Sequence, residues 1–243
     1  MKKSLPYIIP IFRSVLFIIG GLVFAWISGQ SLSESSSWWP ILCVIFNLIT
    51  IFVLIFVCKF EGTDYKALIH FKRKQLSFKN ILFITLLMLS VGVGGLYIFG
   101  LFIYGHVPTI LIQPIPVWIA VINTILLPVT IVFAELPLYF GYSFNRIKEQ
   151  TGNKVLAMSY IIFFYALQHS FIPLLFDWKY ILFRFLSFLP LLIVLGLLYN
   201  KKKALAPLMI GHGFLDLATG IQILISSVFP GIFKMIQQTG RLS

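Results

Sequence analysis

The sequence predicts an all-α protein, a polytopic bundle of transmembrane helices. Of its 243 residues, 59% are hydrophobic and only 11% are charged, whereas charged residues make up about a quarter of an ordinary soluble domain. A helix of roughly 20 apolar residues spans the hydrocarbon core of a bilayer, and continuous apolar runs favour helices over a barrel. Seven runs qualify, which predicts about seven spans in a single transmembrane domain over residues 1–243: 11–29, 39–58, 81–104, 116–142, 155–175, 180–199 and 205–228.

The first three runs carry few polar groups. The first follows a Met-Lys-Lys opening that also occurs in secretory signal peptides, but Arg13 and the long apolar stretch after it favour a retained signal anchor. The second contains both cysteines of the chain, for which we expect a packing role. The third contains Gly92, Gly94 and Gly95, which we expect to permit close approach of a neighbouring helix.

Prolines mark the later runs. Pro128 and Pro137 fall in the fourth run, and Pro173 falls near the end of the fifth. Proline removes a helical hydrogen bond and kinks the helix, so we expect these helices to free backbone groups that line a cavity.

Positive charge is distributed unequally between the connections. Fourteen of the 19 Lys and Arg residues fall on one side of the predicted membrane, in residues 2–3, 59–79, 146–154 and 201–203. The connections 30–38 and 105–115 have none. Because basic loops are retained in the cytoplasm, we expect the amino terminus inside and the carboxyl terminus outside. The net charge of +12 therefore needs no nucleic acid as a partner. The loop 59–80 is expected either to contact anionic headgroups of membrane lipids or to be a plain solvated loop.

Four ionisable side chains fall inside these apolar runs: Glu135, His169, His212 and Asp216. Each costs several kcal/mol at membrane depth unless it faces a polar cavity and pairs with other polar groups. At about 1.5 Å per residue from the cytoplasmic ends of their helices, the four reach overlapping depths. A lone histidine in an apolar helix is more often a packing residue, but the combination predicts one site.

Local spacing supports this interpretation, since residues four apart share one face of a helix. Three pairs have this spacing: Glu135 with Tyr139, Tyr165 with His169, and His212 with Asp216. We therefore expect Tyr139 and Tyr165 to support the site.

The order and spacing of these residues resemble the type II CAAX-processing and bacteriocin-processing intramembrane proteases, also called the CPBP or Abi family. Its motifs are Glu-Glu-x-x-x-Arg, Phe-x-x-x-His and His-x-x-x-Asn/Asp. The chain reads Glu135-Leu136-Pro137-Leu138-Tyr139-Phe140-Gly141, then Tyr165-Ala166-Leu167-Gln168-His169, then His212-Gly213-Phe214-Leu215-Asp216. The resemblance covers roughly residues 115–225, which we expect to form the protease core.

The chain departs from the family pattern in its first motif. Leu136 stands where the family has a second Glu, and Phe140 stands where it has Arg. In the second motif, Tyr165 replaces Phe.

The resemblance implies hydrolysis of a peptide bond inside the membrane. Glu135 would act as general base on a water, and His169 would position that water or help to balance the charge on Glu135. His212 and Asp216 would stabilise the oxyanion of the tetrahedral intermediate. The substrate would be a hydrophobic or lipid-anchored peptide that enters from the cytoplasmic half of the bilayer. Short loops, small size and Lys and Ile richness favour the plasma membrane of a prokaryote.

Cofactor use stays open at this point. The family has been described both as metalloproteases and as metal-free enzymes with a glutamate-activated water. The chain has no His-Glu-x-x-His helix, which would have indicated zinc. If a divalent metal such as zinc binds, its ligands would be His169, His212 and Glu135, with a water in an open position.

Two other functions fit the same residues. The altered first motif is also typical of a non-catalytic family member, which would act as a membrane scaffold, a regulator or a bacteriocin immunity factor. A small proton-coupled transporter could use the same acids and imidazoles as a proton relay.

Overall fold

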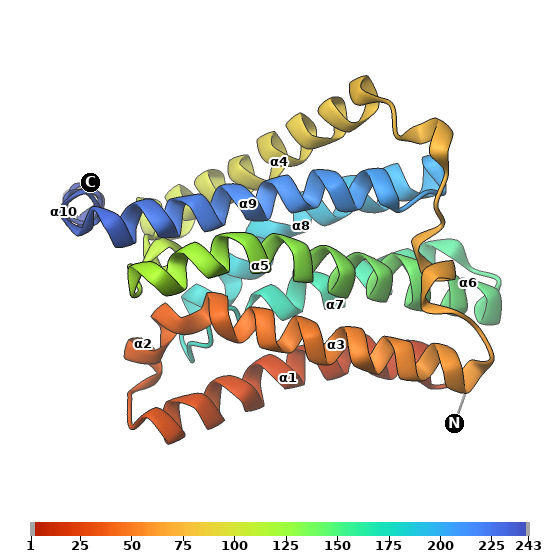
Figure 1. Cartoon of the computed structure of the whole chain (residues 1–243), viewed down its shortest axis with the longest axis horizontal. Coiled ribbons are helices and arrows are strands. Elements are labelled where there is room, and N and C mark those ends of the chain that lie inside the picture. The colour runs from red at the N-terminus through yellow and green to blue at the C-terminus, as the bar shows by residue number, and fades with distance from the viewer. Residues whose placement is uncertain (1–2, 242–243) are drawn as a thin grey trace.

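The computed structural model describes residues 3–241 and contains only helices and their connections in that range (Figure 1). The helices are α1 Leu5–Ser28, α2 Leu32–Ser35, α3 Trp39–Glu61, α4 Phe78–Tyr104, α5 Val117–Leu136, α6 Asn145–Thr151, α7 Lys154–His169, α8 Trp178–Lys202, α9 Ala206–Val228 and α10 Pro230–Arg241. A π-helical segment, Pro137–Phe144, joins α5 to α6. The predicted all-α class is confirmed. Lys2, one of the charges counted for orientation, lies outside the described residues.

Six helical stretches in the described part are long and apolar enough to cross a membrane: Leu5–Ser28, Leu32–Glu61, Phe78–Tyr104, Val117–Thr151, Trp178–Lys202 and Ala206–Val228. The fifth expected span, 155–175, is instead the 16-residue helix α7, which ends at His169. Pro173 follows four residues later, and proline disfavours helical conformation in the residue before it. The chain then turns back into α8.

Helix α5 lies at the centre of the bundle (Figure 1). It packs against α9 on one side and α3 on the other, while α4 covers α8 and α9, and α7 packs between α1 and α8. The basic segments 59–79, 146–154 and 201–203 lie at the same end of the bundle, and α2 and α10 lie at the opposite end. This arrangement agrees with the unequal charge in the sequence.

Helices α4 and α8 approach closely at Gly95. A Cβ atom on Gly95 would collide with the backbone oxygen of Ser187, and one on Gly92 would press on Leu215. Around Gly94, by contrast, no atom lies within 4 Å of the position of a Cβ. The prediction of close helix approach is thus confirmed for Gly95 and Gly92 but wrong for Gly94.

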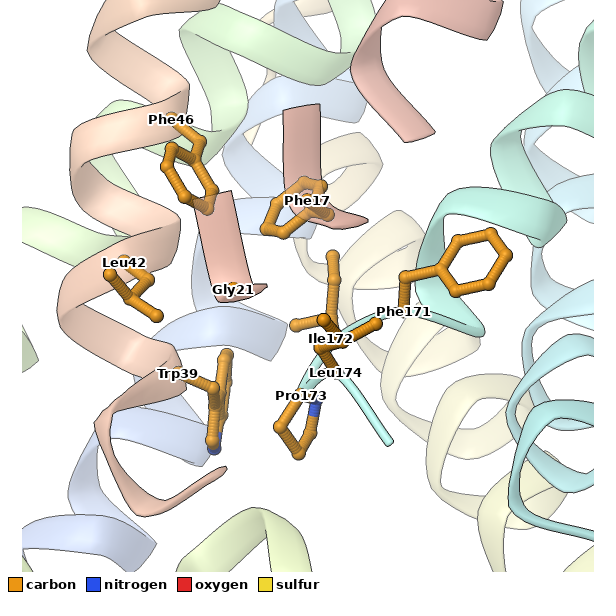
Figure 2. Close-up of a pocket in the computed structure, with 9 residues that line it drawn as sticks. All are labelled: Phe17, Gly21, Trp39, Leu42, Phe46, Phe171, Ile172, Pro173 and Leu174. Carbon is orange, nitrogen blue, oxygen red and sulfur yellow. The ribbon is translucent and has the colours of Figure 1, made fainter. Parts of the chain in front are cut away.

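The segment after α7 is anchored to the first helices. Figure 2 shows a small apolar pocket where residues 171–174 lie against α1 and α3. Phe17 and Phe46 meet edge to face there, with ring centroids 5.2 Å apart. A Cβ atom on Gly21 would lie 2.8 Å from the Leu174 side chain. This packing holds the segment after α7 against the first helices.

The π-helical segment starts where Pro137 interrupts the helix. Pro137 has no N–H to donate to the carbonyl of Phe133, so that oxygen needs another partner. The hydroxyl of Tyr65, from the loop 62–77, donates to it at 2.6 Å. At the other end of the segment, the amide of Asn145 donates to the carbonyls of Phe140 and Gly141 at 3.0 and 2.9 Å. Such widened turns often occur at functional sites.

Candidate active site

Glu135, the penultimate residue of α5, is completely buried. Its Oε1 atom accepts hydrogen bonds from Arg13 Nη2 at 2.9 Å and from Gln168 Nε2 at 2.6 Å. Its Oε2 atom accepts one from the Tyr165 hydroxyl at 2.8 Å and lies 3.3 Å from His212 Nε2. Four side chains from α1, α7 and α9 therefore surround one carboxylate.

Arg13, on α1, balances the charge of Glu135. Its guanidinium is also completely buried, and it lies over the ring of Phe17 at 5.2 Å. Besides Glu135, it donates to Gln168 Oε1 at 2.6 Å, Thr50 Oγ1 at 2.7 Å and Asn47 Oδ1 at 2.6 Å. A buried ion pair is tolerated when further hydrogen bonds satisfy both groups. Both groups of this pair meet that condition.

Gln168 and the two predicted tyrosines hold this ion pair in place. Gln168 Oε1 accepts from Arg13 Nε and from the Tyr139 hydroxyl, the latter at 2.8 Å, while its Nε2 donates to Glu135. The rings of Tyr139 and Tyr165 are stacked with centroids 4.1 Å apart and an interplanar angle of 10°. Both tyrosines are therefore part of the network around Glu135.

His212 and Asp216, one turn apart on α9, form the other wall. His212 Nε2 lies 3.4 Å from the Tyr165 hydroxyl and 3.5 Å from Asp216 Oδ2. Two buried polar atoms here, His212 Nδ1 and Asp216 Oδ2, have no hydrogen-bond partner within residues 3–241. A buried polar atom without a partner costs about 1–3 kcal/mol. Each of these two atoms therefore has an unused hydrogen-bonding position inside the bundle.

His169 lies beside this network. Its Nδ1 is 2.8 Å from the backbone oxygen of Tyr165, and its ring stacks on Phe188 at 3.7 Å. Among the described residues, no hydrogen bond or ion pair joins it to Glu135, His212 or Asp216. The structure thus brings three of the four predicted residues into one network and places His169 next to Tyr165, with ring centroids 5.5 Å apart.

Four members of the network are not among the residues predicted from the sequence: Arg13, Asn47, Thr50 and Gln168. The sequence favours Arg13 as part of a retained signal anchor whose span begins near residue 11. The helix begins at Leu5, so Arg13 lies more than two turns inside it. Polar residues inside otherwise apolar runs were the signal that could have indicated all four.

The predicted metal ligands Glu135, His169 and His212 do not converge on one point in the structure. Within residues 3–241, no group of three or more His, Cys, Asp and Glu residues is placed to hold a metal ion. The Glu135 carboxylate is already bound by Arg13, Gln168 and Tyr165, so the donors do not fit a zinc ion in this arrangement. Metal binding stays a prediction that requires the Arg13–Glu135 pair to separate.

One comparison with known proteins gave a match. The model of a family described as type II CAAX prenyl endopeptidase Rce1-like matches residues 113–218. This range holds Glu135, His169, His212 and Asp216 but not Arg13, and it confirms the resemblance inferred from the motifs. Comparisons with curated proteins and with solved structures gave no match.

Proposed function

We propose that the chain, whose residues 113–218 match the model of the Rce1-like family of type II CAAX prenyl endopeptidases, is an intramembrane endopeptidase. Its substrate is a hydrophobic or lipid-anchored peptide. One observation carries the proposal: a fixed, buried carboxylate on Glu135 faces His212 and Asp216, each of which has a buried atom without a partner.

Glu135 is the general base in this proposal. A carboxylate must be ionised to take a proton, and the adjacent guanidinium of Arg13 favours the ionised form. Gln168 and Tyr165 fix the direction of its oxygens. The carboxylate removes a proton from water, and the water oxygen attacks the carbonyl carbon. The proton then passes to the amine nitrogen as the C–N bond breaks.

The α9 wall binds the carbonyl of the substrate. The 3.3 Å separation from His212 is the longest of the four Glu135 contacts, so in this proposal it is the contact that opens to admit water and substrate. His212, with the nitrogen that has no partner, and Asp216, in its protonated form, can donate hydrogen bonds to the developing oxyanion.

His169 has a positioning role in this scheme. A backbone carbonyl only accepts hydrogen bonds, so Nδ1 carries the proton that is donated to Tyr165. In the neutral ring, Nε2 is then an acceptor that can orient water. Phe188 and the Tyr165 carbonyl together keep the ring in this orientation.

The structure also supports a second candidate, a non-catalytic membrane scaffold or bacteriocin immunity factor. Leu136 and Phe140 replace motif residues and are completely buried. In addition, all acceptor positions of Glu135 are already in use. The network would then only stabilise the bundle. For either function we propose the plasma membrane of a prokaryote as the location.

Cleavage assays on purified protein separate the two functions. Quenched lipidated peptides are incubated with the wild type and with the Glu135→Gln, His212→Ala and His106→Ala variants, each with and without a zinc chelator. His106 lies in an outer turn and serves as the matched control for His212. Thermal unfolding establishes that each variant is folded.

We expect cleavage to fall at least about 100-fold in Glu135→Gln, as for loss of a general base, and in His212→Ala, as for loss of an oxyanion donor. Cleavage should be unchanged in His106→Ala. Undiminished cleavage by folded Glu135→Gln would contradict the mechanism. Absence of cleavage by the wild type, with cellular function kept in Glu135→Gln, would establish the scaffold. A loss of cleavage with chelator would show that a metal is needed.

A further inference from the structure

We propose that a site on the cytoplasmic side of the bundle binds an anionic membrane phospholipid. One acyl chain would fill a cavity between the loop 62–77, α5 and α9, and the phosphate would lie on Lys72, Arg73 and Lys74. The proposal is independent of peptide cleavage, because it rests on a different cavity and different residues.

The cavity has a volume of about 400 Å³, and every residue that lines it is apolar or glycine. Phe71 and Leu76 come from the loop, Val132 from α5, and Met209 and Gly213 from α9. A cavity without polar groups offers no specific contact to a peptide backbone or to a sugar. It suits a hydrocarbon chain, which loses contact with water without leaving hydrogen bonds unmade.

Three cations lie between two of the lining residues. Lys72, Arg73 and Lys74 follow Phe71 and precede Leu76, and all three are exposed. Within residues 3–241 none of them forms an ion pair, and residues 65–80 contain no Asp or Glu. A lipid without net charge would leave these three cations without a counterion, whereas the phosphate of an anionic lipid would neutralise them.

The cavity adjoins the two helices that carry the candidate active site. Val132 is three residues before Glu135 on α5, and Gly213 follows His212 on α9. A Cβ atom on Gly213 would lie 3.3 Å from Val132, so the two helices touch at the wall of the cavity. An acyl chain bound here would contact both helices at once.

Native mass spectrometry of delipidated protein tests the proposal directly. The probes are phosphatidylglycerol and phosphatidylcholine with identical acyl chains, added one at a time to the folded full-length protein. The headgroup variant is Lys72→Gln/Arg73→Gln/Lys74→Gln, and its matched control is Lys59→Gln/Lys148→Gln/Lys154→Gln, which removes three exposed cations at the same end of the bundle. The cavity variant is Val129→Trp, and its control is Val121→Trp, an exposed position two turns away on α5.

We expect the first phosphatidylglycerol to bind at least 10-fold more tightly than phosphatidylcholine. The headgroup variant should remove this preference, and Val129→Trp should weaken binding of both lipids, while each control retains wild-type binding. Equal affinity of the two lipids for the wild type would overturn the proposal. So would an equal loss in both triple variants, which would indicate attraction to the basic surface as a whole, or unchanged binding in Val129→Trp.

Discussion

At the scale of single residues, the ion pair between Arg13 and Glu135 dominates the candidate site. Both side chains are fully buried, and their nearest atoms are 2.9 Å apart. Removal of one partner from such a pair typically costs about 3–5 kcal/mol, because the remaining charge is buried without compensation. The cost of removing both charges is smaller, since no isolated charge remains.

This difference predicts the behaviour of a mutant cycle. Arg13→Gln should lower the free energy of unfolding by about 3–5 kcal/mol, and Arg13→Gln/Glu135→Gln should recover a substantial part of that loss. Unfolding in detergent, followed by tryptophan fluorescence, provides the measurement. Lys179→Gln, which removes an exposed cation, should change little. If Arg13→Gln were as stable as the wild type, the ion pair would not hold the site together.

The acidic and imidazole part of the site could be predicted from the sequence, whereas its counterion could not. Glu135, His212 and Asp216 stand out because charged groups are rare in apolar runs, and Tyr165 follows from helical spacing. Arg13 belongs to a helix 122 residues away from Glu135 in the sequence. Nothing in local spacing joins the two, so only the packing of α1 against α7 and the π-helical segment brings them together.

At the scale of helices, the contact between α4 and α8 depends on one glycine. The backbone oxygen of Ser187 occupies the space that a Cβ atom on Gly95 would need. A backbone atom cannot move aside as a side chain can, so the two helices must separate if Gly95 gains a side chain. Membrane helices depend on such small residues for close packing.

We therefore expect Gly95→Ala to lower the thermal stability of the protein and Gly94→Ala to leave it unchanged. The two substitutions add the same methyl group to neighbouring positions of one helix, but at Gly94 the methyl group meets open space. Thermal melting of the two variants in the same detergent measures the difference. Equal melting temperatures would mean that α4 and α8 adjust without cost.

The sequence predicted the existence of the helices better than their ends. Long apolar runs indicate helices reliably, but the π-helical segment after Glu135 has no such signal. Pro137 marks a break in the hydrogen-bond pattern, yet the new partner of the Phe133 carbonyl is Tyr65 from a distant loop. Likewise, Pro173 indicates that α7 ends before it, but the packing of residues 171–174 on α1 and α3 is a tertiary effect that periodicity does not contain.

At the scale of the whole molecule, the fold gathers the basic connections at one end of the bundle. The connections rich in Lys and Arg lie at one end of the bundle with α6, and α2 lies at the other end (Figure 1). The positive-inside rule then predicts that the end with α6 faces the cytoplasm.

Accessibility of single cysteines tests this orientation. In a variant in which Cys43 and Cys58 are replaced by Ala, we expect Ser33→Cys to react with a membrane-impermeant maleimide in intact cells. Gln150→Cys should react only after the cells are lysed. Both positions are exposed, and they lie at opposite ends of the bundle. The reverse labelling pattern would mean that the chain is inserted the other way round.

The position of Arg13 on the first helix affects how the protein is inserted into the membrane. The ribosome makes α1 well before α5, so Arg13 enters the membrane region while its carboxylate partner does not yet exist. An arginine alone at the centre of a helix opposes insertion by about 2.5–3.5 kcal/mol. We therefore expect α1 to stay shallow, with its guanidinium in interfacial water, until α5 arrives. In a nascent chain arrested before residue 135, we expect the cysteine of a Ser14→Cys variant to react with a water-soluble label. In a chain arrested after α7, the same cysteine should be protected.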